Sequence, residues 1–284
     1  YTGEDTLSLH DALPISYDVR FKNVTGNSGL AMTRNDAAGT APTSDEFSVA
    51  AGVLYVNGGV AFNDGSCLFS YRPTTRNIIE KCTAWGNIHL DSNTFREGHG
   101  IVLDDLASGN IIRRCTLYGN DGMGISINNG GSNLITSNLI YDNGWFGIGA
   151  SGKSNNLDNN TIASNNKQSA ALGYEIYMSP QSGSTVRNNI IKANPNNAVY
   201  GVNAASGTTV SNNAVRGFTT AETPAGSNTI TSDPLLQDNF YLASGSPAIG
   251  AGVFIDYSSD YKNRFRKNPP TVGAYEYATA RGSR

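Results

Sequence analysis

The sequence has few charged residues, few cysteines and no long apolar run, and these shortages exclude several classes of protein. Asp, Glu, Lys and Arg make up 15% of the 284 residues and leave a formal net charge of −3. Because the basic residues form no cluster that could neutralise phosphates, we expect no nucleic-acid partner. No apolar stretch approaches the roughly 18 residues of a membrane helix, so we expect no membrane span.

The three cysteines, Cys67, Cys82 and Cys115, are too few for a disulfide scaffold and lack the CxxC spacing of zinc sites. Residues 1–16, YTGEDTLSLHDALPIS, lack the basic and apolar regions of a signal peptide and resemble translated adaptor sequence at the end of a fragmentary reading frame. We therefore exclude residues 1–16 from the site. We expect upstream sequence to be missing, and a secretion signal is one candidate for it.

A repeat is the main feature that the chain does contain. The segment NIIEKCTAWGN recurs as NIIRRCTLYGN, NLITSNLIYDN and three more degenerate copies, with a period near 23 residues and two longer intervals of 33 and 29 residues. The six copies occupy residues 77–87, 110–120, 133–143, 155–165, 184–194 and 208–218. Self-similarity at such a period predicts a solenoid.

Apolar residues at the third and eighth positions of each copy, without helical periodicity, predict short strands. A further apolar run, such as HGIVLD or MGISIN, lies between copies. Strands this short bury no face alone, so each coil must stack on its neighbour. We predict an all-β protein: a right-handed parallel β-helix over residues 17–230, with rungs about 4.8 Å apart. A loop-rich segment, residues 231–284, is expected to close its C-terminal edge.

The sixth position of the repeat predicts a ladder of side-chain hydrogen bonds. Its residues in successive coils are Cys82, Cys115, Asn138, Asn160, Asn189 and Asn213. Stacked amides can bond to the same residue one rung above and below, which satisfies polar groups that turn inward. We interpret the two cysteines as buried thiols in the place of ladder asparagines. A disulfide or a metal pair is the alternative.

These Asn-rich coils and their G-I strands, over about residues 70 to 218, resemble the right-handed parallel β-helix repeat proteins of the pectate-lyase superfamily. The tail, with SPAIGAG and VGAYEY, resembles the C-terminal segment of secreted bacterial proteins of this kind. The resemblance implies action on an acidic polysaccharide, outside the cell or at its surface. In such lyases a basic residue removes the C5 proton of a uronic acid while Ca²⁺ or a cationic side chain neutralises the carboxylate.

Alternation along the G-I strands predicts which residues face the core. Ile101 and Leu103, with their equivalents in later coils, are expected to point inward. The outward positions are small or polar and include Asn128, Glu175 and Tyr177, which we predict to bind substrate. A face of this composition suits a sugar-binding groove, and an ordinary solvated face is the alternative.

Aromatic residues and two inserted loops further localise the predicted groove. Trp85, Tyr118 and Tyr141 share one column of the repeat, which is typical of a stacking ladder, whereas Trp145 breaks the pattern and is our predicted sugar platform. The insertions, around NIHLDSNTFREG and NKQSAALG, both precede G-I strands. Insertions in solenoids often wall the binding face, so we expect them to flank this sheet.

Two acidic residues are candidates for chemistry. Glu97 and Asp121 each lie three positions before a strand glycine, so the repeat places them one rung apart, at about 5 Å between backbones. Such a pair could bind Ca²⁺, with Asp142 as a further ligand. It could also supply the acid and nucleophile of a retaining glycosidase. A pair of exposed turn acids is the alternative.

His99 and Lys153 are the candidate bases. Histidine titrates near neutrality, which suits general base catalysis, although Gly-His-Gly is also a natural turn into a strand. Three hypotheses follow: a monomeric lyase on a uronate polymer, a non-catalytic surface or adhesin module, and a glycoside hydrolase that uses Glu97 and Asp121.

Overall fold

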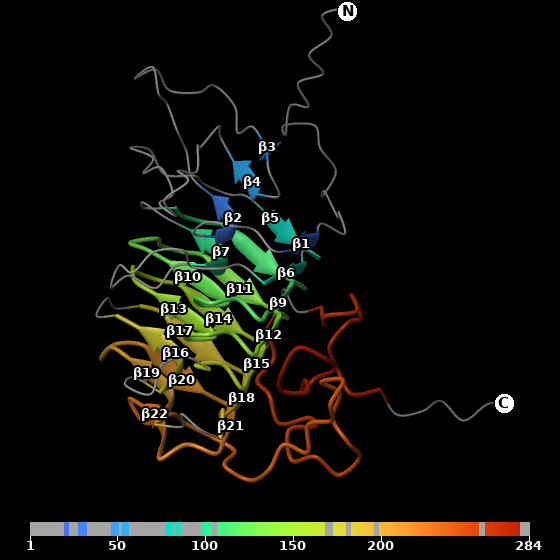
Figure 1. The fold of residues 1–284 in the computed structure, drawn as a ribbon. Helices are drawn as coiled ribbons and strands as arrows, with labels where there is room; N and C mark the ends of the chain where they lie inside the picture. The colour runs from blue at the N-terminus through green and yellow to red at the C-terminus, as the bar shows by residue number, and fades with distance from the viewer. Residues whose placement is uncertain are drawn as a thin grey trace, which may run out of the picture.

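The protein is a right-handed parallel β-helix in which three sheets enclose one core (Figure 1). The computed structural model describes the backbone of strands β1 to β4 and then residues 78–81, 83–86, 98–103, 107–167, 173–179, 183–195, 199–255 and 259–278. In each complete coil the chain passes through the six-stranded, the seven-stranded and the nine-stranded sheet in turn, as in β8, β9 and β10. The predicted fold class is confirmed.

Each sheet consists of strands from successive coils. The six-stranded sheet contains, in order, β20 (Thr209–Ser211), β17 (Thr185–Arg187), β14 (Asn156–Asp158), β11 (Leu134–Thr136), β8 (Ile111–Arg113) and β5 (Ile78–Glu80). The seven-stranded sheet contains β1 (Arg20–Lys22), β6 (Thr83–Trp85), β9 (Thr116–Tyr118), β12 (Leu139–Tyr141), β15 (Thr161–Ala163), β18 (Ile190–Lys192) and β21 (Ala214–Arg216).

The nine-stranded sheet contains β22 (Thr220–Thr223), β19 (Tyr200–Ala204), β16 (Tyr174–Met178), β13 (Ile148–Ala150), β10 (Ile125–Ile127), β7 (His99–Leu103), β2 (Ser28–Met32), β4 (Val53–Val56) and β3 (Phe47–Ala50). Its strands from β22 to β4 pair in parallel, and β3 pairs with β4 antiparallel. The described residues include no helix of the length and apolar character that crossing a bilayer requires.

The core follows the predicted columns of the repeat. Ile125 pairs with Ile101 on one side and with Ile148 on the other, and all three are fully buried. The second predicted inward column is also buried, and it consists of Leu103, Ile127, Ala150, Met178 and Ala204. Because each coil stacks the same residue on its neighbour, these columns join into a single hydrophobic cluster along the solenoid.

The predicted asparagine ladder lies at the corner between the six-stranded and seven-stranded sheets. Asn160 shows the pattern of bonding: its Oδ1 accepts hydrogen bonds from the backbone N–H and the Nδ2 of Asn138. Its own Nδ2 donates to the carbonyl of Ile135 and to Oδ1 of Asn189. Every hydrogen-bonding group of this buried amide is therefore satisfied. The ladder ends where Asn213 donates to the carboxyl group of Glu222.

Two further ladders, which the sequence analysis did not predict, occupy the other two corners. One consists of Asn110, Asn133 and Asn155 and ends on the hydroxyl of Ser184. The other consists of Asn120, Asn143 and Asn165 and ends on the carboxyl group of Glu175. These asparagines are the first and eleventh residues of the repeat. All three corners of the coil are thus held by the same side-chain chemistry.

Cys115 takes the place of a ladder asparagine, as the repeat predicts. Its backbone N–H donates to Oδ1 of Asn138 at 2.9 Å, and its buried thiol faces the carbonyl of Ile79 at 3.7 Å. An asparagine at this place donates to the equivalent carbonyl, as Asn138 does to Ile112. Cys115 is fully buried, whereas Cys82 lies outside the described residues.

The aromatic column at the outer surface of the seven-stranded sheet is a stacking ladder, as predicted. Trp85 stacks on Tyr118 with ring centroids 6.0 Å apart, and Tyr118 stacks on Tyr141 at 5.0 Å. Phe240 from the C-terminal segment continues the row beyond Tyr141, at 4.5 Å. These rings therefore join successive coils to one another and to the C-terminal segment.

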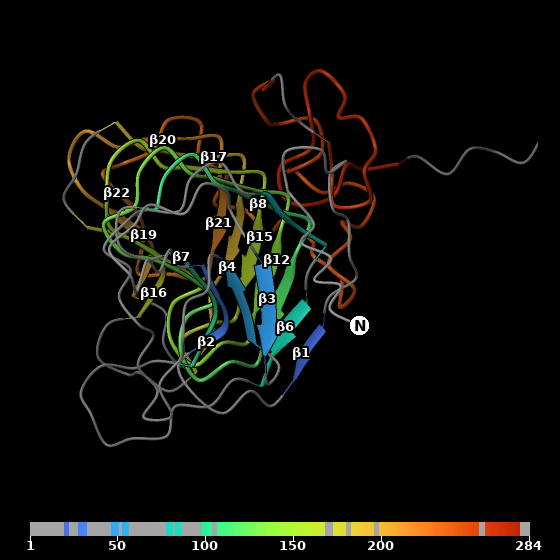
Figure 2. The ribbon, with the colours of Figure 1, turned by 90° about the horizontal axis from the view of Figure 1, so that it is seen from above.

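The described C-terminal segment lies along the flank of the β-helix, beside the seven-stranded sheet (Figures 1 and 2). Val272 packs with Ile190 and Ala214 on the outer side of that sheet, and the N–H of Ala274 donates to the hydroxyl of Thr161. The sequence predicts a segment that closes the C-terminal edge instead. A partial rung lies at the C-terminal edge of the β-helix, and in it Ser227 forms an isolated β-bridge with Ser211.

Arg266 forms hydrogen bonds that hold this segment against the β-helix. Its buried guanidinium donates to the carbonyls of Thr271, Gly273 and Ala274, and also to the hydroxyl of Ser137 in the β-helix. Burial lowers the pKa of Arg266 to about 10, which leaves it charged at neutral pH. One cation thus organises three carbonyls of the segment and connects them to a coil.

Replacement of Asn160 by alanine tests the ladder. The substitution removes the acceptor of the backbone N–H and of one Nδ2 hydrogen of Asn138, and it removes the side-chain donor to the carbonyl of Ile135. Since an unsatisfied buried group costs about 1–3 kcal/mol, we expect a loss of at least roughly 3 kcal/mol in the free energy of unfolding. Urea denaturation measures it. Asn128→Ala, at an exposed position, is the control, and equal losses in the two variants would contradict the assigned role.

Candidate functional site

Five aromatic side chains form a continuous group on the outer side of the nine-stranded sheet, which we call the aromatic stripe: Trp145, Phe146, Tyr174, Tyr177 and Tyr200. The ring of Phe146 lies 4.5 Å from that of Trp145 and 5.4 Å from that of Tyr174. The ring of Tyr174 lies 5.5 Å from that of Tyr177 and 5.2 Å from that of Tyr200. The stripe therefore crosses three successive coils, parallel to the axis of the solenoid.

One column of the repeat generates most of the stripe. The residue before the strand glycine, or before Glu175 in its place, is Phe146, Tyr174 or Tyr200 in the three coils that carry the stripe. The parallel register stacks these positions, because Tyr174 pairs directly with Tyr200. Trp145 and Tyr177 are among the substrate-binding residues that the sequence predicts, whereas Phe146 and Tyr200 are not. Alignment of the residue before each strand glycine carries the signal that could have found them.

A glycine in β13 allows the stripe to lie close to the sheet. A Cβ atom added to Gly149 would meet the Sδ of Met123 at 2.4 Å and the ring of Phe146 at 3.4 Å. Met123 and Phe146 thus lie over the strands, and Ser126 in β10 is only 3% exposed. The predicted open polar groove is wrong at this column, since the surface offers aromatic and thioether groups.

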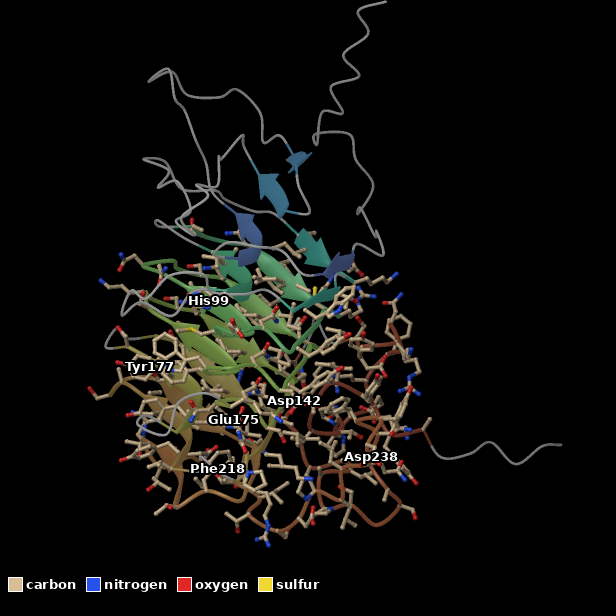
Figure 3. All side chains as sticks on the ribbon, viewed as in Figure 1. His99, Asp142, Glu175, Tyr177, Phe218 and Asp238 are labelled. Carbon is tan, nitrogen blue, oxygen red and sulfur yellow. The ribbon has the colours of Figure 1, made fainter. Side chains whose placement is uncertain are left out.

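Trp145 and Tyr177 are the predicted substrate-binding residues that lie in the stripe (Figure 3 labels Tyr177). Both side chains are half-buried, so part of each ring remains available to a ligand. The indole N–H of Trp145 is buried and meets no acceptor among the described residues. Trp145 therefore offers its ring face, rather than its donor, to anything that binds here.

The prediction that Glu175 faces outward and binds substrate is wrong. Its side chain is 1% exposed and points into the coil. There its two carboxyl oxygens accept hydrogen bonds from the backbone N–H and from the Nδ2 of Asn165. The strand glycines of other coils occupy the same inward-facing position. A Cβ atom added to Gly124, for example, would lie 2.3 Å from the side chain of Ile140. Side-chain alternation fails here because the chain turns a corner, and two successive residues face the core.

Burial gives Glu175 an unusual titration. Desolvation raises its pKa from 4.5 to about 8, although the hydrogen bonds from Asn165 act in the opposite direction. Glu175 is a structural group that ends an asparagine ladder directly beneath Tyr174. Its protonation state therefore bears on the stability of the coil that carries the stripe.

His99 directly precedes the strand glycine Gly100, so it occupies the same position of the repeat as Phe146, Tyr174 and Tyr200. It is nearly buried, and its Nδ1 accepts a hydrogen bond from the backbone N–H of Met123 at 2.8 Å. This bond fixes the neutral tautomer that carries its proton on Nε2. In that state Nδ1 is already occupied, so the geometry does not suit the predicted role of His99 as a general base.

The three predicted metal ligands do not form a described metal site. Glu97 lies outside the described residues, and Asp121 is half-buried in the turn before β10. Asp142 is exposed and forms an ion pair with Lys167 at 2.9 Å. No group of three or more His, Cys, Asp or Glu side chains in the described ranges could hold a metal ion. The N–H of Gly122 donates to the carbonyl of Gly98. The turn that contains Gly122, before β10, and the residue that precedes β7 therefore lie on adjacent rungs.

Lys153 and Asn128 lie at the C-terminal ends of strands in the nine-stranded sheet, whereas Asp121 lies at the N-terminal end of such a strand. Asn128 directly follows β10 and Lys153 follows β13, and both side chains are exposed. Asp121 and Trp145, in contrast, precede these two strands. The predicted base Lys153 is therefore separated by the length of a strand from the predicted acid.

Comparison with known proteins agrees with this architecture. The family model for the right-handed β-helix region matches residues 23–173, more than half of the chain. The chain therefore belongs to the right-handed β-helix family.

Among solved structures, the chain is similar to a crystal structure of the pectate lyase Pel9A, at 15% identity and a TM-score of 0.49. That match covers 74% of this chain and 67% of the other. A comparison with curated proteins finds no match.

Replacement of Glu175 by glutamine tests the role of the buried carboxyl group. Because the folded state holds the proton of Glu175 more tightly than the unfolded state, rising pH destabilises the fold between about 4.5 and about 8. Glutamine keeps an acceptor and has no such proton. We expect the stability of the native protein, relative to Glu175→Gln, to decline across this interval in urea denaturation at several pH values. A difference that is constant with pH would contradict the assignment.

Proposed function

We propose that this protein binds a polysaccharide chain along the aromatic stripe and cleaves an acidic, uronate-containing polymer by β-elimination, as a monomer that acts outside the cell. The observation that carries the proposal is the stripe itself, which has a half-buried aromatic ring on each of three successive coils. Tyrosine and tryptophan combine an apolar face with a polar edge. That combination matches a pyranose, which has C–H faces and hydroxyl edges.

The direction of the stripe favours a polymeric ligand. Phe146, Tyr174 and Tyr200 lie in one column, so their rings follow the solenoid axis rather than a single strand. A chain bound there crosses the strands and meets an aromatic group at each coil. The inserted segments of the repeat directly precede β7 and β16 in the sequence, and most of their residues lie outside those that the structure describes.

The resemblance to pectate-lyase-like proteins favours elimination as the reaction. That reaction needs a base for the C5 proton and a positive charge against the uronate carboxylate. Asp121 precedes β10 and His99 begins β7, one and two coils before the start of the stripe, and Lys153 is the described cationic candidate among the predicted residues. The described residues bring together no ligand set for Ca²⁺, so we assign no step of the reaction to a metal.

A non-catalytic surface module is the second candidate, and the placement of the predicted bases favours it. His99 uses Nδ1 for the backbone of Met123, and Lys153 lies at the far end of the strands. Under this alternative the stripe still binds a polysaccharide, and the chain is not cleaved. A glycoside hydrolase, the third candidate, depends on Glu97 together with Asp121.

Incubation of the protein with a panel of polyuronates, with and without Ca²⁺, distinguishes the three candidates. We expect growth of the ultraviolet absorbance of unsaturated products on at least one polyuronate, because β-elimination leaves a double bond in the new chain end. New reducing ends without that absorbance would indicate hydrolysis. Binding without any new chain ends would indicate a non-catalytic module and would contradict the lyase proposal.

Replacement of Trp145 or Tyr177 by alanine tests the binding surface. Loss of one stacking ring costs about 1.4 kcal/mol if it is a principal contact, so we expect roughly tenfold weaker binding to the polysaccharide that the native protein prefers. Affinity electrophoresis in gels that contain the polymer measures this change. Phe265→Ala, which removes a ring that is 94% exposed on the C-terminal segment, is the matched control. Equal retardation of all variants would exclude the stripe.

A further inference from the structure

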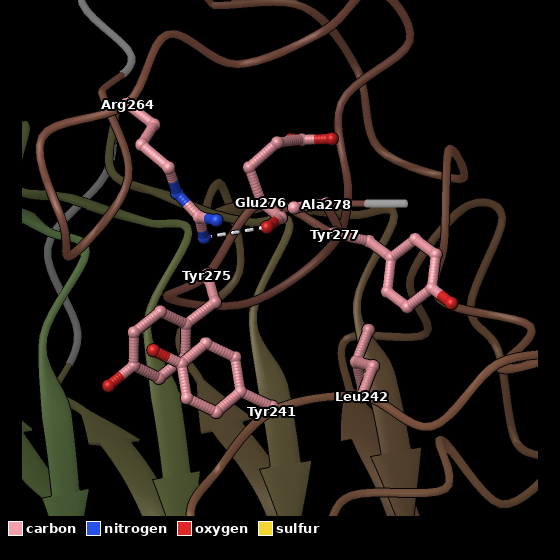
Figure 4. Close-up of a pocket in the computed structure, with 7 residues that line it drawn as sticks. All are labelled: Tyr241, Leu242, Arg264, Tyr275, Glu276, Tyr277 and Ala278. Atoms are coloured by element: carbon pink, nitrogen blue, oxygen red, sulfur yellow. Dashed lines mark hydrogen bonds between the residues drawn. The ribbon is translucent and has the colours of Figure 1, made fainter. Parts of the chain in front are cut away.

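A cavity of about 220 Å³ lies within the C-terminal segment, and Figure 4 shows the residues that line it. Its walls include Tyr241, Tyr275 and Tyr277, with Leu242 at one side and Arg264 at another. This volume is below the roughly 300–1,000 Å³ of pockets for drug-sized ligands, so it suits a single small ring. The segment packs beside β12 and β18, whereas the stripe lies over β13, β16 and β19, on the other side of the β-helix (Figures 1 and 2).

The tyrosines give the cavity firm aromatic walls. Tyr241 and Tyr275 stack with centroids 4.2 Å apart, and Tyr261 meets the edge of Tyr275 at 5.2 Å. Tyr275 is 8% exposed and packs with Leu139 and Ala274, which fixes this pair against the β-helix. Because these side chains are already ordered, binding of a ligand costs little of their conformational entropy.

The charges inside the segment cancel one another. Asp260 is fully buried and accepts hydrogen bonds from Nε of Arg264 and from the backbone N–H of Lys262. Glu276 is also buried, and its carboxyl oxygens accept from the N–H and the hydroxyl of Thr271. The two buried carboxylates, Asp260 and Glu276, thus face inward and balance the guanidinium groups of Arg264 and the buried Arg266.

The surface beside the cavity carries the remaining positive charge. Nζ of Lys267 donates to the carbonyl of Tyr277, a wall residue, and Lys262 lies 5.7 Å from the ring centre of Tyr261. Both lysines are exposed, and neither forms an ion pair with any residue in the described ranges. Lys267 thus places a positive charge beside the wall of the cavity. It favours a ligand that carries a negative charge.

From the ring-sized aromatic cavity and the two lysines beside it, we infer that the C-terminal segment contains a second carbohydrate-binding site, for one pyranose unit that bears a carboxylate. Tyr277 and Tyr241 would contact the sugar ring, and Lys267 its carboxylate. Arg264 orders the wall, because it holds the carbonyl of Glu276 at 2.8 Å (Figure 4). The inference concerns binding alone, and it does not rest on the reaction proposed for the β-helix.

Calorimetric titration with a trisaccharide of galacturonic acid tests this inference on the full chain. In a Trp145→Ala/Tyr177→Ala variant, which weakens the stripe, we expect one remaining site. Lys262→Glu/Lys267→Glu in that background should weaken this site about tenfold or more, since it reverses both charges. Both lysines are exposed, so thermal unfolding should stay unchanged. Binding that is insensitive to the charge reversal, or no remaining binding at all, would overturn the inference.

Two further measurements identify the chemistry. The neutral trisaccharide of galactose should bind about tenfold more weakly than the acidic one, and equal affinity would contradict the role of the lysines. Tyr277→Ser should weaken the remaining site without changing the cleavage of polyuronates, and unchanged affinity would exclude the cavity. If the native protein binds the acidic trisaccharide at the Tyr277-dependent site alone, and yields no unsaturated products from any polyuronate, the proposed function is refuted and this inference stands.

Discussion

The hydrogen bond between stacked asparagine amides is the interaction on which the rest of the structure depends. A coil of about 23 residues must turn three corners, and each turn brings polar backbone groups toward the core. At one such corner Asn160 accepts two donors from the preceding coil and donates both its amide hydrogens. Buried polar groups are tolerated only when they are satisfied in this way. The flat sheets, and the columns of side chains on them, follow from corners that repeat.

The fold could be predicted because the same physical problem recurs in every coil, and the sequence repeats its solution. The corner residues were harder. Glu175 occupies a position that alternation assigns to solvent, yet two successive residues face the core where the chain turns. The C-terminal segment has no repeat, so its place on the flank depends on specific partners such as Arg266 and Ser137, which no pattern reveals.

The site was predicted in part for a similar reason. Trp145 and Tyr177 stood out as aromatic residues near the G-I strands, and the structure places them in one stripe. The predicted chemical groups are scattered, since proximity in a repeat template does not reveal which end of a strand a residue occupies. Lys153 follows its strand and Asp121 precedes one, and this difference separates them. Glu97 lies outside the described residues.

The asparagine ladders also have a direction. In each row the side-chain oxygen accepts from the preceding coil, and one amide hydrogen donates to the side chain of the following coil. The amide dipoles therefore align head to tail, much as peptide dipoles do in an α-helix, and the positive end of every row lies toward the C-terminus. Two of the three rows end there on a carboxyl group, at Glu175 and at Glu222. The solenoid thus carries an electrical polarity along its axis, and acidic side chains terminate it.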